Sequence, residues 1–421
     1  MLTRPGDAVS AAARRRGALA HPTYRRLFGA QVVALAGTGV TTVALTLLAF
    51  DLAGEDAGVV LGVALALKMV VYVFGAPLIA AVAVRVAPRR LLVSLDVARA
   101  GVVSAMPFVT EVWHVYALIV LVNLCAAGFT PAFQATIADV LPEERTYTQA
   151  LSLSRLAYEL ESLSSPLLAA ALLAVASYDG LFAVNGVAFL CSAVLVLSTT
   201  LPARAVAPGE ASWRSRVTAG LRRYLATPRL RGLLALNVAV AAGGATVIVN
   251  TVVYVREELG REASDVAWTL AASGAGAMLA ALALPRVLEH VRDRTVMLSG
   301  GTLLALGLAL AAIAGTFGSL LAVWFVLGVG LALVQTPGGR LLQRSGSRAD
   351  RPGLFAAQFS LSHACWLAAY PLAGVLGAVL GLATTALLLA VLAVGAVAVA
   401  AVVWRPMTRD GSAYDAAEFA S

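Results

Sequence analysis

The sequence is dominated by apolar runs longer than about 18 residues, which short polar stretches separate. A run of this length can cross a membrane as a helix, because a helix satisfies its backbone hydrogen bonds within itself. Of the 421 residues, 60% are hydrophobic and only 13% are charged, whereas about a quarter of a soluble domain is charged. The chain has too little polar surface to cover itself in water, so we predict an all-α membrane protein.

Twelve such segments can be delimited in the sequence. They cover residues 27–50, 59–84, 91–109, 114–137, 150–177, 181–201, 230–255, 264–288, 295–315, 318–339, 354–380 and 382–404. The longest polar interruption lies near the middle of the chain and leaves six segments on each side. We therefore expect five parts: an N-terminal tail (1–26), a six-helix bundle (27–202), a linker (203–229), a second six-helix bundle (230–404) and a C-terminal tail (405–421).

Arginines cluster in alternate connections of this predicted topology, as they do in cytoplasmic loops. They occupy the N-terminal tail, the linker, the C-terminal tail and the connections after the second, eighth and tenth segments. The other connections are acidic or neutral, apart from Arg256 and Arg261, which four acidic residues surround. This distribution predicts a multi-pass protein of the cytoplasmic (inner) membrane with both termini cytoplasmic. The first 26 residues hold six arginines and no apolar core before a cleavage site, so we interpret them as a tail rather than a signal peptide.

Several other classes of function find no support in the sequence. The net charge of +8 follows from the arginine topology, so nucleic-acid binding is not expected. There is no Gly-x-x-x-x-Gly-Lys stretch for ATP-driven transport, and no nucleophile–base set for an enzyme; we expect no cofactor. Cys125, Cys191 and Cys365 lie in apolar runs, and an odd number of cysteines does not indicate a disulfide framework.

The linker carries a helical pattern of its own. Trp213, Val217, Leu221, Tyr224 and Leu225 recur at helical spacing among arginines. This pattern predicts either an amphipathic helix on the cytoplasmic membrane surface or a plain connector between the two bundles.

The connection after the second segment reads Ala80-Ala81-Val82-Ala83-Val84-Arg85-Val86-Ala87-Pro88-Arg89-Arg90. With two six-segment halves and a cytoplasmic linker, it resembles the major facilitator superfamily, in which this connection usually reads Gly-x-Leu-Ala-Asp-Arg-x-Gly-Arg-Arg. Here the acidic position is Val84 and alanines replace the glycines. The corresponding connection of the second half keeps only Arg292, Asp293 and Arg294. The resemblance implies two bundles that rock about a binding site near the membrane midplane.

A narrower resemblance lies in residues 133–142 and 150–161 of the first half and 356–366 and 370–374 of the second. These stretches are similar to the nickel-resistance exporters and their relatives among the drug:proton antiporters. The similarity extends from Tyr24 to about Trp404 and implies proton-coupled export. Characterised nickel-resistance members tend to end in a His-rich tail, whereas the C-terminal tail here contains no histidine. That departure leaves the substrate open.

Ionisable residues inside apolar segments are functional candidates, because a charge in hydrocarbon is costly. Lys68 is the only lysine of the chain, and it lies about nine residues into the second segment, roughly 14 Å deep. Lysine, unlike arginine, can release its proton when it is desolvated. We expect Lys68 to act as a titrating switch or as the counter-charge of an acid; a structural ion pair is the alternative.

The fifth segment carries Arg155, Glu159 and Glu161. Arg155 and Glu159 are four residues apart and can pair on one helix face. Glu161 lies about 200° around the helix from Glu159, so the two carboxylates face different surroundings. We expect at least one of them to take part in proton coupling or substrate binding.

Charges near the cytoplasmic end of the third segment indicate a gate. Asp96 and Arg99 are three residues apart there. In the superfamily such charges usually belong to the contact that locks the two halves. We therefore predict gating roles for Asp96 and Arg99, together with Arg85, Arg89 and Arg90.

His363 is the only histidine within a predicted span, about nine residues into the eleventh. The superfamily's arrangement implies that spans two and eleven meet between the halves, which would place His363 and Lys68 at similar depth. A nickel ion would favour the imidazole, so His363 is a metal or substrate candidate. Cys365 is two residues away and faces elsewhere, and a histidine hydrogen-bonded between helices is the alternative reading.

Uncharged polar residues in the spans are candidates for lining a cavity, with helix–helix hydrogen bonding as the alternative. They are Gln31, Thr38, Asn123, Asn237 and Asn250. In the superfamily, spans one, four, seven and ten usually line the cavity.

Together these features predict a proton-coupled secondary transporter that exports a small solute by alternating access. The substrate is a divalent transition metal such as nickel or, alternatively, an amphipathic organic compound or drug. We expect protons, that small-molecule or metal-ion substrate and the lipid bilayer as partners, and a monomer. The degenerate connection after the second segment keeps one rival from another class, a membrane sensor that has lost transport.

Overall fold

The computed structural model describes residues 17–202 and 213–404, and every regular element in these ranges is a helix. The expected tails and the first part of the linker (1–16, 203–212 and 405–421) lie outside the described residues. The predicted all-α fold is confirmed for the residues that are described.

The first half of the chain forms six long helices joined by short turns. They are α2 (Pro22–Ala53), α3 (Ala57–Ala83), α4 (Pro88–Ser104), α5 (Val112–Val140), α6 (Glu144–Leu173) and α7 (Tyr178–Leu197). Three 3-10 turns accompany them, namely η1 (Ala18–Ala20), η2 (Gly54–Asp56) and η3 (Met106–Phe108). Proline stands in the first turn of α2 and of α4, where its missing N–H costs nothing and its φ suits a helix.

The second half repeats this plan after the linker helix α8 (Trp213–Ala226). Its long helices are α9 (Pro228–Ala245), α11 (Ala263–His290), α12 (Asp293–Ala311), α13 (Phe317–Arg344), α14 (Arg351–Leu380) and α15 (Leu382–Val403). The predicted seventh span is not one regular helix. After α9 it continues through the π-helical turn η4 (Thr246–Asn250), the short α10 (Thr251–Val253) and a second π-helical turn, η5 (Tyr254–Glu258).

Ten stretches of the described chain are long and apolar enough to cross a membrane. One of them, Pro22–Ala83, contains both α2 and α3. α6 is not among them, and it carries Arg155, Glu159 and Glu161 in its middle. A multi-pass membrane protein is therefore confirmed, whereas the count of twelve spans and the placement of the termini stay predictions.

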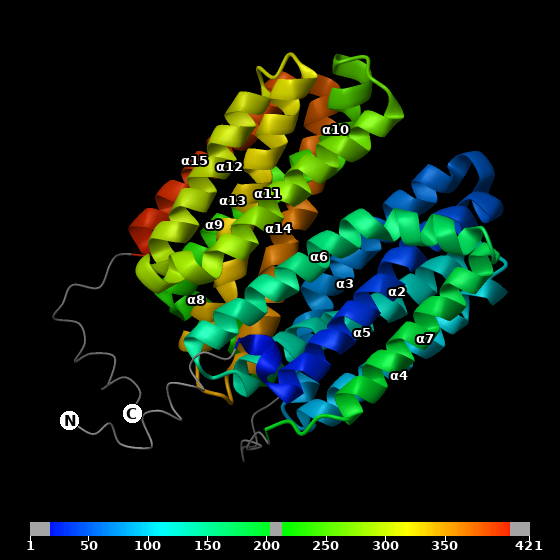
Figure 1. The fold of residues 1–421 in the computed structure, drawn as a ribbon, viewed down its shortest axis with the longest axis vertical. Coiled ribbons are helices and arrows are strands. Elements are labelled where there is room, and N and C mark those ends of the chain that lie inside the picture. The colour runs from blue at the N-terminus through cyan, green and yellow to red at the C-terminus, as the bar shows by residue number, and fades with distance from the viewer. Residues whose placement is uncertain (1–16, 203–212, 405–421) are drawn as a thin grey trace.

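The two halves form two helical bundles that lie side by side (Figure 1). We call the end at which α2 and α9 begin and α7 and α15 end the entry end, and the opposite end the far end. The ribbons of the two bundles diverge toward the far end (Figure 1). Between the bundles, α3 packs against α14 and α6 packs against α11. The implied meeting of spans two and eleven is thus present.

Small residues let neighbouring helices approach closely within the second bundle. A Cβ added at Gly328 of α13 would collide with the Ser273 carbonyl of α11, and one at Gly276 would collide with the Phe325 carbonyl. Such contact replaces the hydrophobic effect as the force that holds helices together in a membrane.

The linker helix α8 docks on the protein. Tyr224 is fully buried, and its hydroxyl donates to Gln358 Oε1 of α14 at 2.5 Å. Arg223 forms an ion pair with Asp350 at 2.7 Å. The linker therefore contains a helix whose inner face covers the entry end of α14, and a position on the membrane surface stays a prediction.

Candidate functional site

The two bundles meet at mid-height where α3 crosses α14. The ring of Tyr72 on α3 lies 5.0 Å from the Phe359 ring and 4.8 Å from the His363 ring, both on α14, centroid to centroid. At the next residue of each helix, the Ser360 hydroxyl of α14 donates to the Val73 carbonyl of α3 at 2.5 Å. Side chains from both halves therefore share one aromatic contact.

Lys68 lies beside this aromatic contact. Its ammonium is 5.7 Å from the centroid of the Tyr72 ring, within the range of a cation–π attraction. Its charge acts on Glu161 of α6 and on His363 of α14. Among the described residues no hydrogen bond or ion pair holds Lys68, so its charge acts without a direct partner on an acid of its own half and an imidazole of the other.

Glu159 and Arg155 form the ion pair that their spacing predicts. The guanidinium and the carboxylate are 2.5 Å apart, and both side chains are more than four-fifths buried. Arg155 also donates to the Gln335 side chain of α13, which belongs to the second half. Glu159 itself lies near Gly274 of α11. This pair therefore sits on the seam between α6, α11 and α13.

Glu161 faces a different neighbour from Glu159, in agreement with the 200° that separates them. Its carboxylate lies against Gly39 of α2, where a Cβ would collide with it. Lys68 supplies the nearby positive charge. The two carboxylates thus belong to two clusters, one at the seam between the halves and one inside the first half.

One ring nitrogen of His363 forms a hydrogen bond within its own helix. Its Nδ1 lies 2.7 Å from the Phe359 carbonyl oxygen, which fixes the tautomer with the proton on Nδ1 and leaves Nε2 as an acceptor. Aromatic rings flank the imidazole on two sides. No group of three or more His, Cys, Asp or Glu side chains that could hold a metal ion occurs within the described ranges.

Most of the cavity candidates bond to their own helices. Thr38, Asn123 and Asn237 each donate to the carbonyl four residues earlier. Gln31 of α2 instead accepts from the Ser154 hydroxyl of α6 at 2.9 Å. Asn250 is 2% exposed, and its Nδ2 has no hydrogen-bond partner in the described chain. A cavity-lining role for these five residues stays a prediction.

The predicted gating residues do not join the two halves in this conformation. Arg99 forms an ion pair with Asp96, which also accepts from the Ser192 hydroxyl at 2.8 Å. The Arg99 guanidinium lies 4.1 Å from the Phe129 ring and 4.3 Å from the Phe189 ring, all within the first bundle. The other three members of the set are exposed at the entry end; they are Arg85, Arg89 and Arg90.

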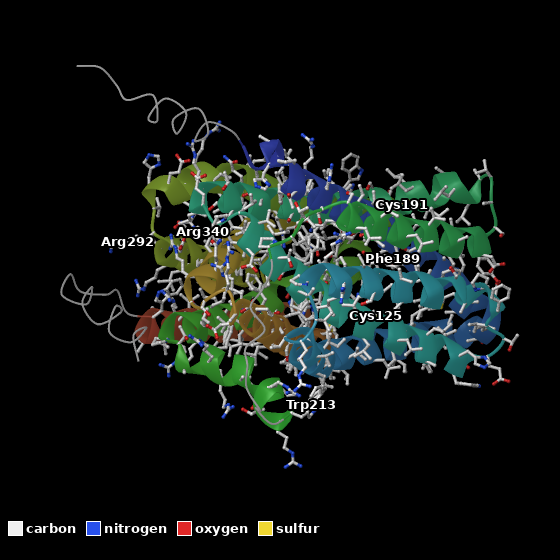
Figure 2. All side chains as sticks on the ribbon, turned by 90° about the horizontal axis from the view of Figure 1, so that it is seen from below. Cys125, Phe189, Cys191, Trp213, Arg292 and Arg340 are labelled. Carbon is white, nitrogen blue, oxygen red and sulfur yellow. The ribbon has the colours of Figure 1, made fainter. Side chains whose placement is uncertain are left out.

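Another set of charges connects the halves at the entry end. Glu144 of α6 receives hydrogen bonds from Arg340 and Arg344 of α13. Both arginines also pair with Asp293 of α12, at 3.2 Å and 2.7 Å. Figure 2 shows Arg340 inside the bundle and Arg292 at its edge. We call Glu144, Asp293, Arg340 and Arg344 the entry cluster.

Electrostatic interactions keep Glu144, the acidic residue that the first half contributes to the entry cluster, ionised. The hydrogen bond from Arg344 lowers the pKa of Glu144, which lies outside the expected span 150–177, and the charge of Arg340 acts in the same direction. Glu144 therefore stays ionised at neutral pH and attracts both arginines of the second half.

A second group of contacts seals the same end. Arg351 of α14 forms an ion pair with Asp139 of α5 at 2.6 Å. Gln343 of α13 donates to the carbonyls of Ala138 and Leu141, at 3.0 Å and 3.1 Å. These donors satisfy the carbonyls that the end of α5 leaves free.

Sequence reasoning missed both groups of entry-end contacts. In the sequence, the arginines of α13 and α14 indicated only which connections are cytoplasmic. Their ion-pair partners could not be identified, because these partners lie in the other half of the chain. The available signal was the acids near helix ends, Asp139, Glu144 and Asp293, which need a counter-charge when they are buried.

Within the described residues, hydrogen bonds and ion pairs join the two bundles from the entry end to mid-height. They begin at the entry cluster and end at Arg155 with Gln335 and at Ser360 with Val73. Toward the far end the ribbons separate (Figure 1). The structure is therefore closed between the bundles at the entry end, and its candidate site lies where the two bundles part.

Comparison with known proteins gives a family and one curated relative. The family model described as Major Facilitator Superfamily matches residues 27–246 and 234–420. The chain is 28% identical over 263 residues to an uncharacterized MFS-type transporter, YfiS, of Bacillus subtilis (strain 168). The match covers 59% of this chain and 61% of that relative, so it spans about three fifths of the relative's length.

Solved structures share the fold at low sequence identity. The human organic anion transporter MFSD10 (TETRAN) is 13% identical with a TM-score of 0.76, over 89% of this chain and 98% of that one. FucP in the outward conformation is 13% identical with a TM-score of 0.72, over 91% and 98% of the two chains. The E. coli fucose:proton symporter FucP is 14% identical with a TM-score of 0.71, over 93% and 100%.

Proposed function

The chain belongs to the Major Facilitator Superfamily, and on that premise we propose that it is a proton-coupled secondary transporter that exports a small organic solute across the cytoplasmic membrane by alternating access. Membrane transport follows from the family. The coupling ion, the substrate and the direction are the proposal.

The observation that carries the proposal is the placement of Lys68. Its ammonium acts on Glu161 of its own half and on His363 of the other half. Because the charge of Lys68 acts on both groups, a proton gained or lost by Glu161 changes the net charge that Lys68 and Glu161 together present to the second half. Such a change can favour one conformation over the other only through its different interaction with the two states.

The arginine distribution supports the orientation of this cycle. Cytoplasmic loops are rich in arginine, and the entry end carries the exposed Arg85, Arg89 and Arg90. With the entry end in the cytoplasm, the structure is the outward-facing state. A proton that enters from outside reaches Glu161, the entry cluster opens, and solute binds from the cytoplasm when the proton leaves.

The surroundings of the site favour an organic solute. Tyr72, Phe359 and His363 offer aromatic rings that contact one another edge-on or tilted, and Lys68 and Glu161 offer opposite charges to a polar group. Flat amphipathic molecules match a site with apolar faces and a few polar groups. Nickel is the second candidate, because His363 Nε2 remains available as a ligand and nickel accepts imidazole.

A growth screen against antibiotics, dyes and divalent metals tests the proposal. Cells that express the protein should tolerate at least one organic compound better than cells that express Lys68→Ala at equal abundance. Dye efflux from the same cells should stop when the proton gradient is dissipated. Efflux that continues without a gradient would contradict proton coupling.

Measurements of nickel tolerance distinguish the two candidate substrates. Nickel tolerance that rises with expression and disappears in His363→Ala would assign the metal instead of the organic solute. His363→Phe is the matched variant, since it keeps the aromatic packing and removes the ring nitrogens.

A further inference from the structure

A groove opens between the two bundles near the entry end, away from the candidate site. Its volume is about 360 Å³, within the usual range of about 300–1,000 Å³ for small-molecule sites, and apolar side chains form most of its walls. η1 contributes Leu19, α6 contributes Leu156, and α11 contributes Leu282 and Pro285. Leu19 and Leu282 are 40% and 60% exposed, so the groove is open to the surroundings of the bundle. We call it the seam groove.

The two long walls of the seam groove are single helix faces that end in an ion pair. On α6, Gln149, Ser152 and Leu156 continue the face of Arg145, with steps of three and four residues, which places them in line. On α11, Leu282 and Pro285 continue toward Glu289 in the same way. Arg145 Nε and Glu289 Oε1 are 2.8 Å apart, so the entry end of an apolar groove carries charge.

A buried hydroxyl in the wall lacks a partner. Ser152 is 4% exposed, and its Oγ has no hydrogen-bond partner in the described parts of the chain. The neighbouring polar side chain is Gln149. Its Oε1 accepts a hydrogen bond from the Ala18 amide at 2.9 Å and does not pair with Ser152. An unpaired hydroxyl in a groove wall is a position for a ligand oxygen, because buried polar groups are normally satisfied.

A bilayer protein gains little from an apolar groove alone, since lipid tails are as apolar as the groove. Selectivity must come from the polar end. Arg145 is 54% exposed, and its Nε pairs with Glu289. Its two terminal amino groups can therefore bind a phosphate, an anion whose geometry suits the guanidinium. An apolar groove in the membrane with an arginine at its headgroup end fits one occupant, a phospholipid.

We propose that the seam groove binds a phospholipid, with an acyl chain between α6 and α11, an ester oxygen near Ser152 and the phosphate on Arg145. The two walls belong to different halves. The lipid therefore binds the state that is closed at the entry end and stabilises that state by linkage.

Native mass spectrometry of the detergent-solubilised protein tests the proposal with two probes that have the same acyl chains, dioleoylphosphatidylglycerol and dioleoylglycerol. The wild type should retain the first and not the second. Arg145→Gln should reduce retention of the phospholipid about tenfold, the value of one charge-assisted contact. Glu289→Gln should raise it, because that variant removes a repelling carboxylate and frees Arg145.

The opposite signs of these two variants separate a lipid site from a structural ion pair, because both variants break the same bond. Leu282→Trp, which fills the groove from an exposed position, should lower retention. Arg286→Gln removes a neighbouring exposed arginine outside the aligned face and should change nothing. Equal retention of dioleoylglycerol, or a change in the same direction in Arg145→Gln and Glu289→Gln, would overturn the proposal.

Discussion

At the scale of single residues, the most informative side chain is Lys68, because its charge is not cancelled by a direct partner. A charge inside a membrane is costly, and the Tyr72 ring and the charge of Glu161 lie near enough to stabilise it. The candidate site therefore has a carboxylate and a cation in the same half, and the charge of the cation also acts on His363 of the other half.

Substitutions at Lys68 test the effect of its charge on transport separately from the effect of its size. We expect Lys68→Gln to reduce gradient-driven efflux by about 10- to 100-fold, because it removes the charge that acts on Glu161 and His363; each factor of ten corresponds to about 1.4 kcal/mol. The measurement is solute uptake into inverted membrane vesicles under an imposed pH gradient, which corresponds to efflux from the cell. Lys68→Arg is the matched variant, which keeps the charge and cannot release a proton. Full activity in Lys68→Arg would rule out titration of the lysine.

The two carboxylates of α6 should respond differently to the same substitution. Glu159→Gln leaves the buried Arg155 without its charge partner and should lower the free energy of unfolding by about 1–3 kcal/mol. Glu161→Gln should fold normally and lose the pH dependence of efflux. Thermal unfolding and vesicle efflux measured on both variants check this, and a stability loss in Glu161→Gln as large as in Glu159→Gln would contradict the separation.

At this scale the sequence predicted which residues carry charge but not what each of them contacts. The Arg155–Glu159 pair was predictable, because its geometry is local to one helix. The contact of Tyr72 with His363 was not, because it depends on how two halves of the chain pack. The Asp96–Arg99 pair was predicted as a gate, yet in this state all of its partners come from the first bundle.

At the scale of elements, α6 joins the regions that must change together. Its first residue belongs to the entry cluster, and its middle carries Arg155, Glu159 and Glu161. One helix therefore carries both an acidic residue of the entry cluster and the charged residues of the candidate site. The sequence predicted this helix and its charges but not its cross-half partners.

The entry cluster should set the balance between the two conformations. Glu144→Gln should shift that balance about fivefold toward the state open at the entry end, because a half-exposed ion pair is worth about 1 kcal/mol after screening. Spin labels at the exposed Pro142 and Arg292 report the distance between the halves there. Arg261→Gln is the control, since its pair with Asp265 lies within one half at the far end. An unchanged distance distribution in Glu144→Gln would contradict the role of the cluster.

The entry cluster should not itself sense pH in the physiological range. The pKa of Glu144 is lowered from its ordinary 4.5. The contribution of Glu144 to the stability of the closed state is therefore complete above pH 4.5. It is lost only as the pH falls through the lower pKa that Glu144 has in the closed state. Between about pH 5 and pH 8 the wild type and Glu144→Gln should therefore show the same pH slope in the Pro142–Arg292 distance. A slope that disappears in Glu144→Gln would assign the sensing to the cluster.

The docking of α8 on α14 depends on close backbone contact. A Cβ at Gly220 would collide with the Gly353 carbonyl, so Gly220→Ala should weaken docking by about 1–3 kcal/mol. Limited proteolysis should then cut within α8 sooner than in the wild type. Gly101→Ala is the control, because the Cβ would meet nothing within 4 Å there. Equal cleavage rates in the two variants would show that the contact is dispensable.

At the scale of the whole molecule, hydropathy and arginine placement predicted two six-helix halves, because membrane insertion acts on local stretches of chain. They could not predict the broken seventh span, where η4 and η5 interrupt the helix, since π turns depend on packing. They also could not predict how the two halves contact each other, because those contacts depend on packing between distant parts of the chain.

The central claim is that protonation near Lys68 controls which end of the molecule is open. Spin labels at the exposed far-end positions Glu55 and Glu262, in a variant without Cys125, Cys191 and Cys365, measure this without knowledge of the substrate. Between pH 5 and pH 8 the distance between the halves should shift from one population to another in the wild type and should stay fixed in Glu161→Gln and Lys68→Gln. The same shift in all three proteins, or no shift in the wild type, would contradict the account.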